Sequence, residues 1–284
     1  MYPASARFVK SPQRLARLKS PSGAAKIRHV TAQPMLLLLQ YDGGAFAGWQ
    51  RQPDERTVQA ELEAGLERLT GQRVPVIGAG RTDSGVHALG QAASAPIPEQ
   101  WRPQELVRAL NAVLPSDIWT LSACRMQGGF DARRHATERT YCYRIGTDAA
   151  ARSPFRHLTE WALGVELDAT LLGESARTVR GEHGFQALSA AGQTKPHYRC
   201  RVLDAEWRPR EDGAGWEFWI TADRFLHRMV RFLVGAMVDI ARGRRPAADL
   251  AVLLEGTDNQ DASPPAPPQG LFLISVRYPP QWYA

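Results

Sequence analysis

One acidic side chain, Asp83, lies in a glycine-rich stretch that could carry out chemistry. The segment GAGRTDSGVHALGQ spans residues 78–91, with Arg81 and His87 on either side of the carboxylate. Its glycines allow positive φ and close approach of a ligand to the backbone. We expect Arg81 to keep a neighbouring carboxylate ionised, and an ionised carboxylate can act as nucleophile or base. The stretch alone fits a turn or helix-capping role for Asp83 equally well, because Asp and Ser favour such positions.

Several other catalytic motifs are absent from the sequence. A dinucleotide fingerprint starting at Gly78 would need glycine at position 83, and a phosphate-binding P-loop would end in Gly-Lys-Ser or Gly-Lys-Thr. There is no Gly-x-Ser-x-Gly elbow, no His-Glu-x-x-His pair and no Cys/His grouping. The three cysteines are odd in number and lack Cys-x-x-Cys spacing. We therefore expect no catalytic metal, no disulfide framework and a reducing, cytoplasmic compartment.

Basic residues are concentrated at the amino terminus. The net charge is +6, yet residues 1–30 hold seven Lys and Arg and no acidic residue, so the remainder is nearly neutral. Residues 1–34 are predicted to be a disordered basic extension: a transit peptide, an RNA-contacting arm, or sequence upstream of a true start at Met35. No apolar run approaches the roughly 18 residues that span a bilayer, so no membrane partner is expected. Evidence for a nucleic-acid partner must come from local clusters.

Hydrophobic periodicity predicts the elements that position Asp83. The first half has strands at 35–41, 74–77, 91–97 and 118–124, with helices starting at Thr57 and Pro103. The second half has strands at 140–145, 199–208, 215–222 and 271–277, with helices at 168–180 and 225–242. Both halves have the β-α-β-β-α-β order of ferredoxin-like (RRM-like) folds. We predict an α+β protein with subdomains at 35–126 and 127–284, whose largely antiparallel sheets join around a central active-site cleft.

Two further segments combine basic and aromatic residues. Residues 130–145 (FDARRHATERTYCYRI) include four arginines, three of which (Arg133, Arg134 and Arg139) lead into a strand that places Tyr141 and Tyr143 on one face. An exposed tyrosine can stack on an unpaired base while arginines bind phosphate, although we expect one of the two tyrosines to belong to the core. Residues 41–52 (YDGGAFAGWQRQ) read as a flexible amphipathic loop that carries Phe46, Trp49 and Arg51.

The predicted helix at 225–242 has an apolar stripe, and three arginines fall on its opposite side: Arg224, Arg228 and Arg231. For a helix of unknown position, such a face is more often solvated than phosphate-binding. Phosphate binding becomes the better interpretation if that face lines the cleft.

Taken in order along the chain, these motifs closely resemble those of the TruA-type tRNA pseudouridine synthases. The matching segments are YDGGAFAGWQRQ at 41–52, GRTDSGVHA at 80–88, LPSDI at 114–118, FDARRHATERTYCY at 130–143, MVRFLVG at 229–235 and GLFL at 270–273. The resemblance covers nearly all of residues 35–279 and leaves residues 1–34 unexplained. Two departures from the family pattern are Ser84, where alanine is usual, and FQALSA at 185–190.

The resemblance implies a role for four residues. Asp83 would be the catalytic residue, Tyr141 would pack against the target base, Arg231 would pair with the catalytic carboxylate, and Arg81 would lie beside a flipped nucleotide. The resemblance also implies a cofactor-free homodimeric isomerase that converts uridine to pseudouridine at positions 38, 39 and 40 of the tRNA anticodon stem-loop.

The chemistry of pseudouridine formation fits these residues. The N1–C1′ bond must break, the base must rotate and a C5–C1′ bond must form, which requires an ionised carboxylate and a dry pocket but no redox partner. Asp83 could attack C1′ or take a proton from C2′, and a uridine in a stem must first be flipped out. Three alternatives are the same chemistry on another RNA, a non-catalytic RNA-binding module, and a glycosidase, which would need a second carboxylate.

Overall fold

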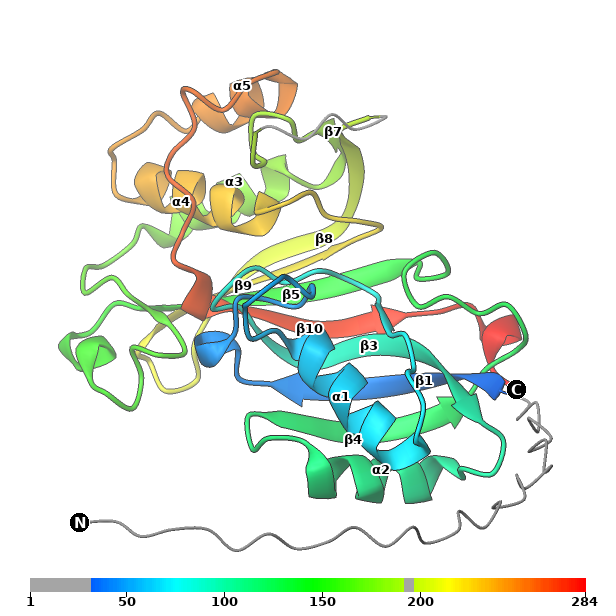
Figure 1. Cartoon of the computed structure of the whole chain (residues 1–284). Helices are drawn as coiled ribbons and strands as arrows, with labels where there is room; N and C mark the ends of the chain where they lie inside the picture. Colours follow the sequence, from blue (N-terminus) through cyan, green and yellow to red (C-terminus); the bar gives the residue numbers. More distant parts are fainter. Residues whose placement is uncertain (1–31, 192–196) are drawn as a thin grey trace, which may run out of the picture. The chain divides into compact units, whose positions relative to one another are not determined.

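Ten strands form a single sheet in the computed structural model, which describes residues 32–191 and 197–284 (Figure 1). The strands are β1 (Ala32–Tyr41), β2 (Ile77–Gly78), β3 (His87–Pro98), β4 (Ile118–Arg125), β5 (Glu138–Gly146), β6 (Trp161–Ala162), β7 (Gly181–Gly184), β8 (Arg199–Pro209), β9 (Gly215–Ala222) and β10 (Leu271–Arg277). Their order is β4-β1-β3-β10-β5-β9-β8-β7, with β2 on β3 and β6 on β5. Only the β10–β3 and β5–β6 pairs are parallel, so a largely antiparallel α+β protein is confirmed.

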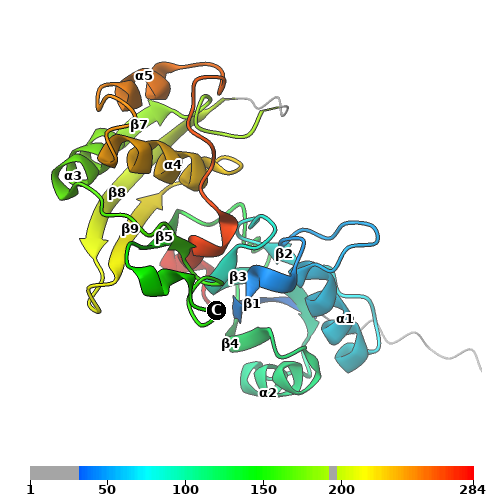
Figure 2. The same ribbon diagram turned by 90° about the vertical axis from the view of Figure 1, so that its left-hand side faces the viewer.

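Five α-helices accompany the described strands, and the two ends of the sheet carry different ones. They are α1 (Val58–Thr70), α2 (Pro103–Val113), α3 (Ala169–Thr178), α4 (Met229–Ala241) and α5 (Asp249–Glu255). Figures 1 and 2 show α1 and α2 beside β1 and β4, and α3, α4 and α5 towards β7 and β8. Thr57 caps α1 by accepting a hydrogen bond from the Ala60 amide, and Gly71 ends that helix in the left-handed region, as such caps commonly do.

The last strand, β10, joins the two halves in the middle of the sheet (red in Figure 1). It runs parallel to β3, with Leu273 opposite Ala88, and antiparallel to β5, with Leu273 also opposite Tyr141. Tyr141 therefore lies two strands away from the start of β3, which directly follows the Asp83 loop. In this way β10 brings the second half of the chain to the predicted catalytic loop.

One hydrophobic core continues through both halves of the sheet. It includes Leu37 and Leu62 from the first half and Phe218 and Leu233 from the second, all fully buried. Eleven of the thirteen residues of α4 are buried, so this helix is central rather than superficial. A helix that is apolar on almost all sides needs protein around it, which agrees with the apolar run in its sequence.

Several predicted boundaries differ from the observed ones. The strand predicted at 74–77 is reduced to Ile77–Gly78, since Pro75 lacks the amide hydrogen that a strand interior needs. The helix predicted at 225–242 begins only at Met229, because Arg228 adopts a left-handed φ of 62° that interrupts helical geometry. The predicted arginine face of that helix is therefore wrong: Arg224 and Arg228 precede the helix and only Arg231 belongs to it. Strands β6 and β7 and helix α5 were not predicted.

Most of the predicted basic extension lies outside the described residues. Its last three positions, 32–34, form the start of β1 instead of a disordered segment. No helix in the described ranges is long and apolar enough to cross a membrane.

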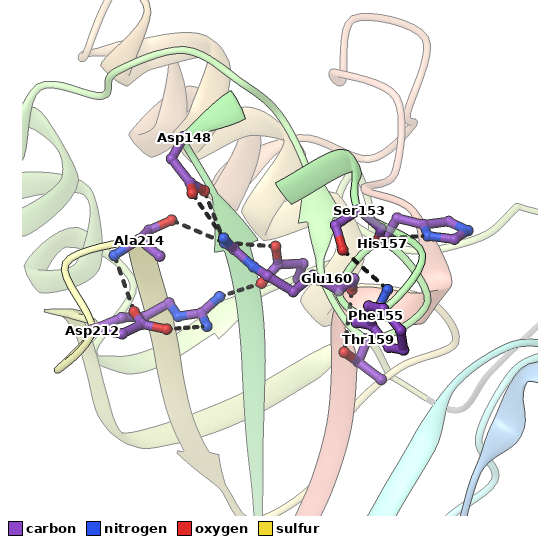
Figure 3. Close-up of polar contacts among 10 residues, drawn as sticks. Asp148, Ser153, Phe155, His157, Thr159, Glu160, Asp212 and Ala214 are labelled. Atoms are coloured by element: carbon purple, nitrogen blue, oxygen red, sulfur yellow. Dashed lines mark hydrogen bonds and ion pairs between the residues drawn. The ribbon is translucent and has the colours of Figure 1, made fainter. Parts of the chain in front are cut away.

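A cluster of ion pairs fixes the connection that follows β5 (Figure 3). Arg156 donates two 2.8 Å hydrogen bonds to Asp148 and also pairs with Glu160 at 2.8 Å. Glu160 is almost fully buried and also pairs with Arg210. Between these anchors the connection holds Phe155 with 93% of its surface exposed. A large apolar side chain is thus presented on a loop that is tied down on both sides.

Candidate active site

The Asp83 loop connects β2 and β3 and is held in place by side chains from neighbouring strands. The Tyr41 hydroxyl lies 2.8 Å from the Thr82 hydroxyl, and the Gln91 side-chain amide donates to the Gly80 carbonyl at 2.8 Å. The Val86 amide donates to the Asp83 carbonyl at 3.2 Å, which closes a turn. The backbone of Asp83 therefore does lie in a turn, while its side chain remains available for other partners.

The glycines of this loop serve two different purposes. Gly85 has a φ of 78° and permits the turn, whereas Gly78 has no positive φ. A Cβ at Gly78 would lie 2.4 Å from the Trp49 ring, and a Cβ at Gly90 would lie 2.1 Å from the Ile274 carbonyl oxygen. The predicted need for positive φ thus applies to Gly85, while Gly78 and Gly90 allow close packing.

Residues 41–52 form a support beneath the Asp83 loop. Phe46 and Trp49 are buried, and the Trp49 amide donates to the Thr82 carbonyl at 3.1 Å. The Ser84 hydroxyl donates to the Phe46 carbonyl at 3.2 Å, a contact that alanine could not make. The prediction of a flexible amphipathic loop is therefore wrong, because its aromatic side chains pack in the core.

The Asp83 carboxylate contacts two groups that arrive from the second half of the chain. Arg231 Nη1 donates to Asp83 Oδ2 at 3.0 Å, while Arg231 Nε donates to the Ala266 carbonyl at 2.7 Å. His227 Nε2 lies 3.3 Å from Asp83 Oδ1. The Asp83 and Arg231 side chains are only 17% and 12% exposed, so this charge-assisted pair is weakly screened by water.

Arg81 is not the cation that pairs with the Asp83 carboxylate, although its position in the sequence suggested this role. Its side chain is exposed, and no ion pair joins it to Asp83 within the described residues. The cation on the carboxylate is Arg231, which is 148 positions away in the chain. Arg81 instead lines the cleft in front of Asp83, where it is free to contact a ligand.

The two tyrosines of β5 differ in their surroundings. Tyr143 is fully buried and donates to the Pro267 carbonyl at 2.7 Å, so it is the core residue of the pair. Tyr141 lines the cleft, with its ring edge-on to Phe225 at a centroid distance of 4.9 Å. Burial raises the pKa of Tyr141 well above its usual value, which keeps the phenol neutral. A neutral ring at the floor of a cleft offers a surface for a planar base.

The cleft has a volume of about 1020 Å³, with Asp83 and Tyr141 among the lining residues. Five exposed arginines line it that have no ion pair to Asp or Glu in the described part of the chain: Arg81, Arg133, Arg134, Arg224 and Arg228. Burial, followed by the neighbouring Arg81 charge, lowers the pKa of Arg133. Crowded cations without acidic partners indicate an anionic ligand such as a nucleic-acid backbone.

Arg139, which sequence reasoning grouped with phosphate-binding arginines, has a structural role. It is buried and donates to the carbonyls of four residues: Ala79, Arg133, Ala136 and Asp223. These carbonyls belong to three segments that line the cleft. Arg139 therefore holds the walls of the cleft together from inside.

Sequence reasoning placed most of the segment between β9 and α4, residues 223–228, in a helix and missed its contacts with Tyr141 and Asp83. The apolar pattern of α4 already begins at Leu226, so hydrophobic periodicity alone predicts a helix that includes this segment. The segment places Phe225 against Tyr141 and His227 against Asp83. The Ala190 amide donates to the His227 carbonyl at 2.9 Å. The FQALSA departure at 185–190 is thus mainly a buried support for this segment.

Comparison with known proteins agrees with this geometry. A family model described as tRNA pseudouridine synthase matches residues 38–132 and 176–279. The chain belongs to this family. It is 39% identical over 244 residues to tRNA pseudouridine synthase A of Myxococcus xanthus, covering 85% of this chain and 91% of that protein. It is 40% identical over 251 residues to the protein of that name from Cupriavidus necator, covering 85% and 89%.

As a member of the tRNA pseudouridine synthase family, the protein is an isomerase that makes pseudouridine in tRNA. The segments matched by the family model contain Asp83, His227 and Arg231, whereas Tyr141 lies between them. Within the described residues, no group of three or more His, Cys, Asp or Glu side chains could hold a metal ion.

The family motif around Asp83 also contains His87, whose contacts indicate a structural role. His87 is buried, and its Nδ1 accepts a hydrogen bond from the Gly43 amide at 3.1 Å. Its Nε2 lies 3.1 Å from the Leu158 carbonyl, an arrangement that fits a neutral ring with the proton on Nε2. Nδ1 also lies 3.1 Å from Asp42 Oδ1, but burial dominates and lowers the pKa of His87. This histidine therefore fastens the end of the Asp83 loop to the connection after β5.

Proposed function

We propose that this synthase converts uridine to pseudouridine at positions 38, 39 and 40 of the tRNA anticodon stem-loop, with Asp83 as its catalytic residue. The observation that carries the proposal is the Asp83 carboxylate in the cleft, held by Arg231 at 3.0 Å. A carboxylate that is mostly shielded from water and hydrogen-bonded to a fixed arginine keeps a defined orientation. A nucleophile or a base needs such an orientation.

The lining residues suggest how a uridine would be received. The base, flipped out of its stem, would pack on the Tyr141 ring, and Arg81 would lie beside the displaced nucleotide. Flipping costs a few kcal/mol. Stacking on the base and phosphate contacts with the rim arginines, which are the five exposed arginines that line the cleft, offset this cost. Arg231, whose side chain is 12% exposed and which is not among the residues that line the cleft, would act on Asp83 rather than on the phosphates.

Asp83 is placed to begin the reaction in either of two ways. Attack on C1′ would break the N1–C1′ bond and form an ester with the carboxylate. Removal of a proton from C2′ would instead expel the base by elimination. In the first route C5 of the rotated base then displaces the carboxylate from C1′, and in the second C5 adds to C1′ while C2′ takes back a proton. In both routes the C5 hydrogen leaves as a proton and N1 gains one, so no electrons are gained or lost. Deuterium at C2′ distinguishes the routes, since only the second gives a primary isotope effect.

The proposal is tested with wild-type protein and Asp83→Asn on total tRNA. We expect wild type to form pseudouridine at positions 38–40, and Asp83→Asn to bind tRNA with no product. Asp204→Asn is a matched control, because Asp204 is an exposed residue of β8 paired with Arg180, and it should behave as wild type. Unchanged activity in Asp83→Asn would contradict the role of Asp83. Modification of other positions would instead support the same chemistry on a different RNA site.

We also propose that the synthase works as a cytoplasmic homodimer of two-subdomain, ferredoxin-like chains. The antiparallel strand orders β4-β1-β3-β2 and β10-β5-β9-β8 support the ferredoxin-like assignment of residues 35–126 and 127–284. Exposure of Phe155 and Leu158 on the ion-paired connection of Figure 3 supports association through an apolar contact. Light scattering on wild type and Phe155→Ser tests this, and a monomeric wild type would contradict it.

A further inference from the structure

His227 is a contact of the catalytic carboxylate that the motifs around Asp83 and Arg231 do not contain. Its Nε2 lies 3.3 Å from Asp83 Oδ1, while Arg231 occupies Oδ2 at 3.0 Å. The Arg231 contact is a hydrogen bond, whereas the longer His227 contact is an approach within ion-pair distance, which is favourable when the nitrogen that faces the carboxylate carries a proton. The two oxygens of Asp83 are therefore contacted by two different side chains.

The backbone around His227 is built to hold this position. Arg228, the next residue, has a left-handed φ of 62°, a conformation that is uncommon for a side chain of its size. On the other side, the His227 carbonyl accepts a hydrogen bond from the Ala190 amide at 2.9 Å. Residues in such conformations persist where the surrounding structure imposes them, and they concentrate at functional sites. The position of His227 is thus imposed by its neighbours rather than left to a free loop.

The two donors also differ in their access to the cleft. His227 lines the cleft and is 41% exposed, whereas Arg231 is 12% exposed and is not among the lining residues. Oδ1 is therefore the Asp83 oxygen whose partner lines the cleft. An N–H group at this oxygen would constrain the rotation of the carboxylate about its Cβ–Cγ bond.

We propose that His227 is a positioning residue that orients Asp83 Oδ1 towards the flipped uridine, in partnership with Arg231 on Oδ2. This inference rests on the proposed catalytic role of Asp83. Without the His227 donor, the carboxylate would keep its charge and its Arg231 pair but would lose one of two constraints on its rotation. The chemical step should slow, while binding of tRNA by the rim arginines should not change.

Two substitutions test the proposal. His227→Leu removes the donor, while His227→Gln keeps a side-chain N–H at similar reach. We expect His227→Leu to lower the single-turnover rate about five- to tenfold, which is less than the effect of a full hydrogen bond to a charged group because the contact is 3.3 Å long, with the Kd for tRNA within about twofold of wild type. We expect His227→Gln to recover most of the rate. His183→Leu is the matched control, since His183 is on β7 and contacts the Arg180 carbonyl.

Three outcomes would overturn the proposal. They are a wild-type rate in His227→Leu, an equally slow His227→Gln with an intact circular dichroism spectrum, and a change confined to the Kd for tRNA. Asp83→Asn in the same assay separates the two hypotheses. Activity in Asp83→Asn contradicts the proposed catalytic role, whereas a wild-type rate in His227→Leu contradicts only the positioning role.

Discussion

Replacing Arg231 by lysine keeps the positive charge beside Asp83 but removes the fixed pair of hydrogen bonds that the guanidinium group makes. Arg231 uses two nitrogens at once: Nε donates to the Ala266 carbonyl at 2.7 Å and Nη1 donates to Asp83 Oδ2 at 3.0 Å. Lysine has a single nitrogen on a flexible stem, so it cannot reproduce both contacts in this arrangement. A hydrogen bond between charged groups contributes about 1.5–3 kcal/mol, more than a neutral one.

If that contribution is lost from the transition state, the rate should fall roughly 10- to 150-fold, at 1.4 kcal/mol per factor of ten. The assay is single-turnover release of tritium from tRNA labelled at uridine C5, because C5 loses its hydrogen when it bonds to C1′. The Kd for tRNA should change less than about threefold, since the net charge is unchanged.

Arg244→Lys is the matched control for this substitution. Arg244 lies beyond the other end of α4, is more than half exposed and approaches Asp239 at 3.9 Å, so its replacement should leave the rate unchanged. An Arg231→Lys protein that reacts within twofold of wild type, with unchanged thermal stability, would refute the argument that Arg231 holds the carboxylate.

Four further predictions follow from the same structure. Tyr141→Phe should slow catalysis with little change in thermal stability, because its hydroxyl has no hydrogen bond to another described residue; equal rates would make the hydroxyl irrelevant. Tyr41→Phe removes two buried hydrogen bonds and should cost about 1–3 kcal/mol, seen as a melting temperature lower by several degrees. Gly78→Ala should cost about 1–3 kcal/mol, since its Cβ would lie 2.4 Å from the buried Trp49 ring; an unchanged chemical denaturation curve would show that the ring can move. Burial lowers the pKa of His87 below 6.5, so its neutral form stabilises the fold above pH 6.5 and that contribution is lost as the pH falls through the folded-state pKa. His87→Gln should make stability less dependent on pH on the acid side of 6.5, and an unaltered acid limb would contradict this account.

Local sequence was sufficient to predict most of the helices and strands and to select Asp83 as the catalytic candidate. Periodicities of 3.6 and 2 residues are properties of single segments, so the main helices and strands could be predicted from them. The order of motifs likewise pointed to Asp83 without any knowledge of packing. The predicted start of the helix at 225–242 was wrong because Arg228, with its φ of 62°, interrupts the helix. Apolar periodicity continues through that residue and gives no sign of the interruption.

The partners of Asp83 were decided by tertiary structure. Sequence proximity suggested Arg81 as the neighbouring cation, but the side chains of Arg231 and His227 reach the carboxylate because β10 brings the second half of the chain alongside β3. Tyr141 and Tyr143 have the same alternation in sequence, yet only Tyr141 lines the cleft. A side-chain pattern records which face of a strand a residue occupies. What that face meets depends on how distant strands pair, which is why the composition of the site became visible only in the folded chain.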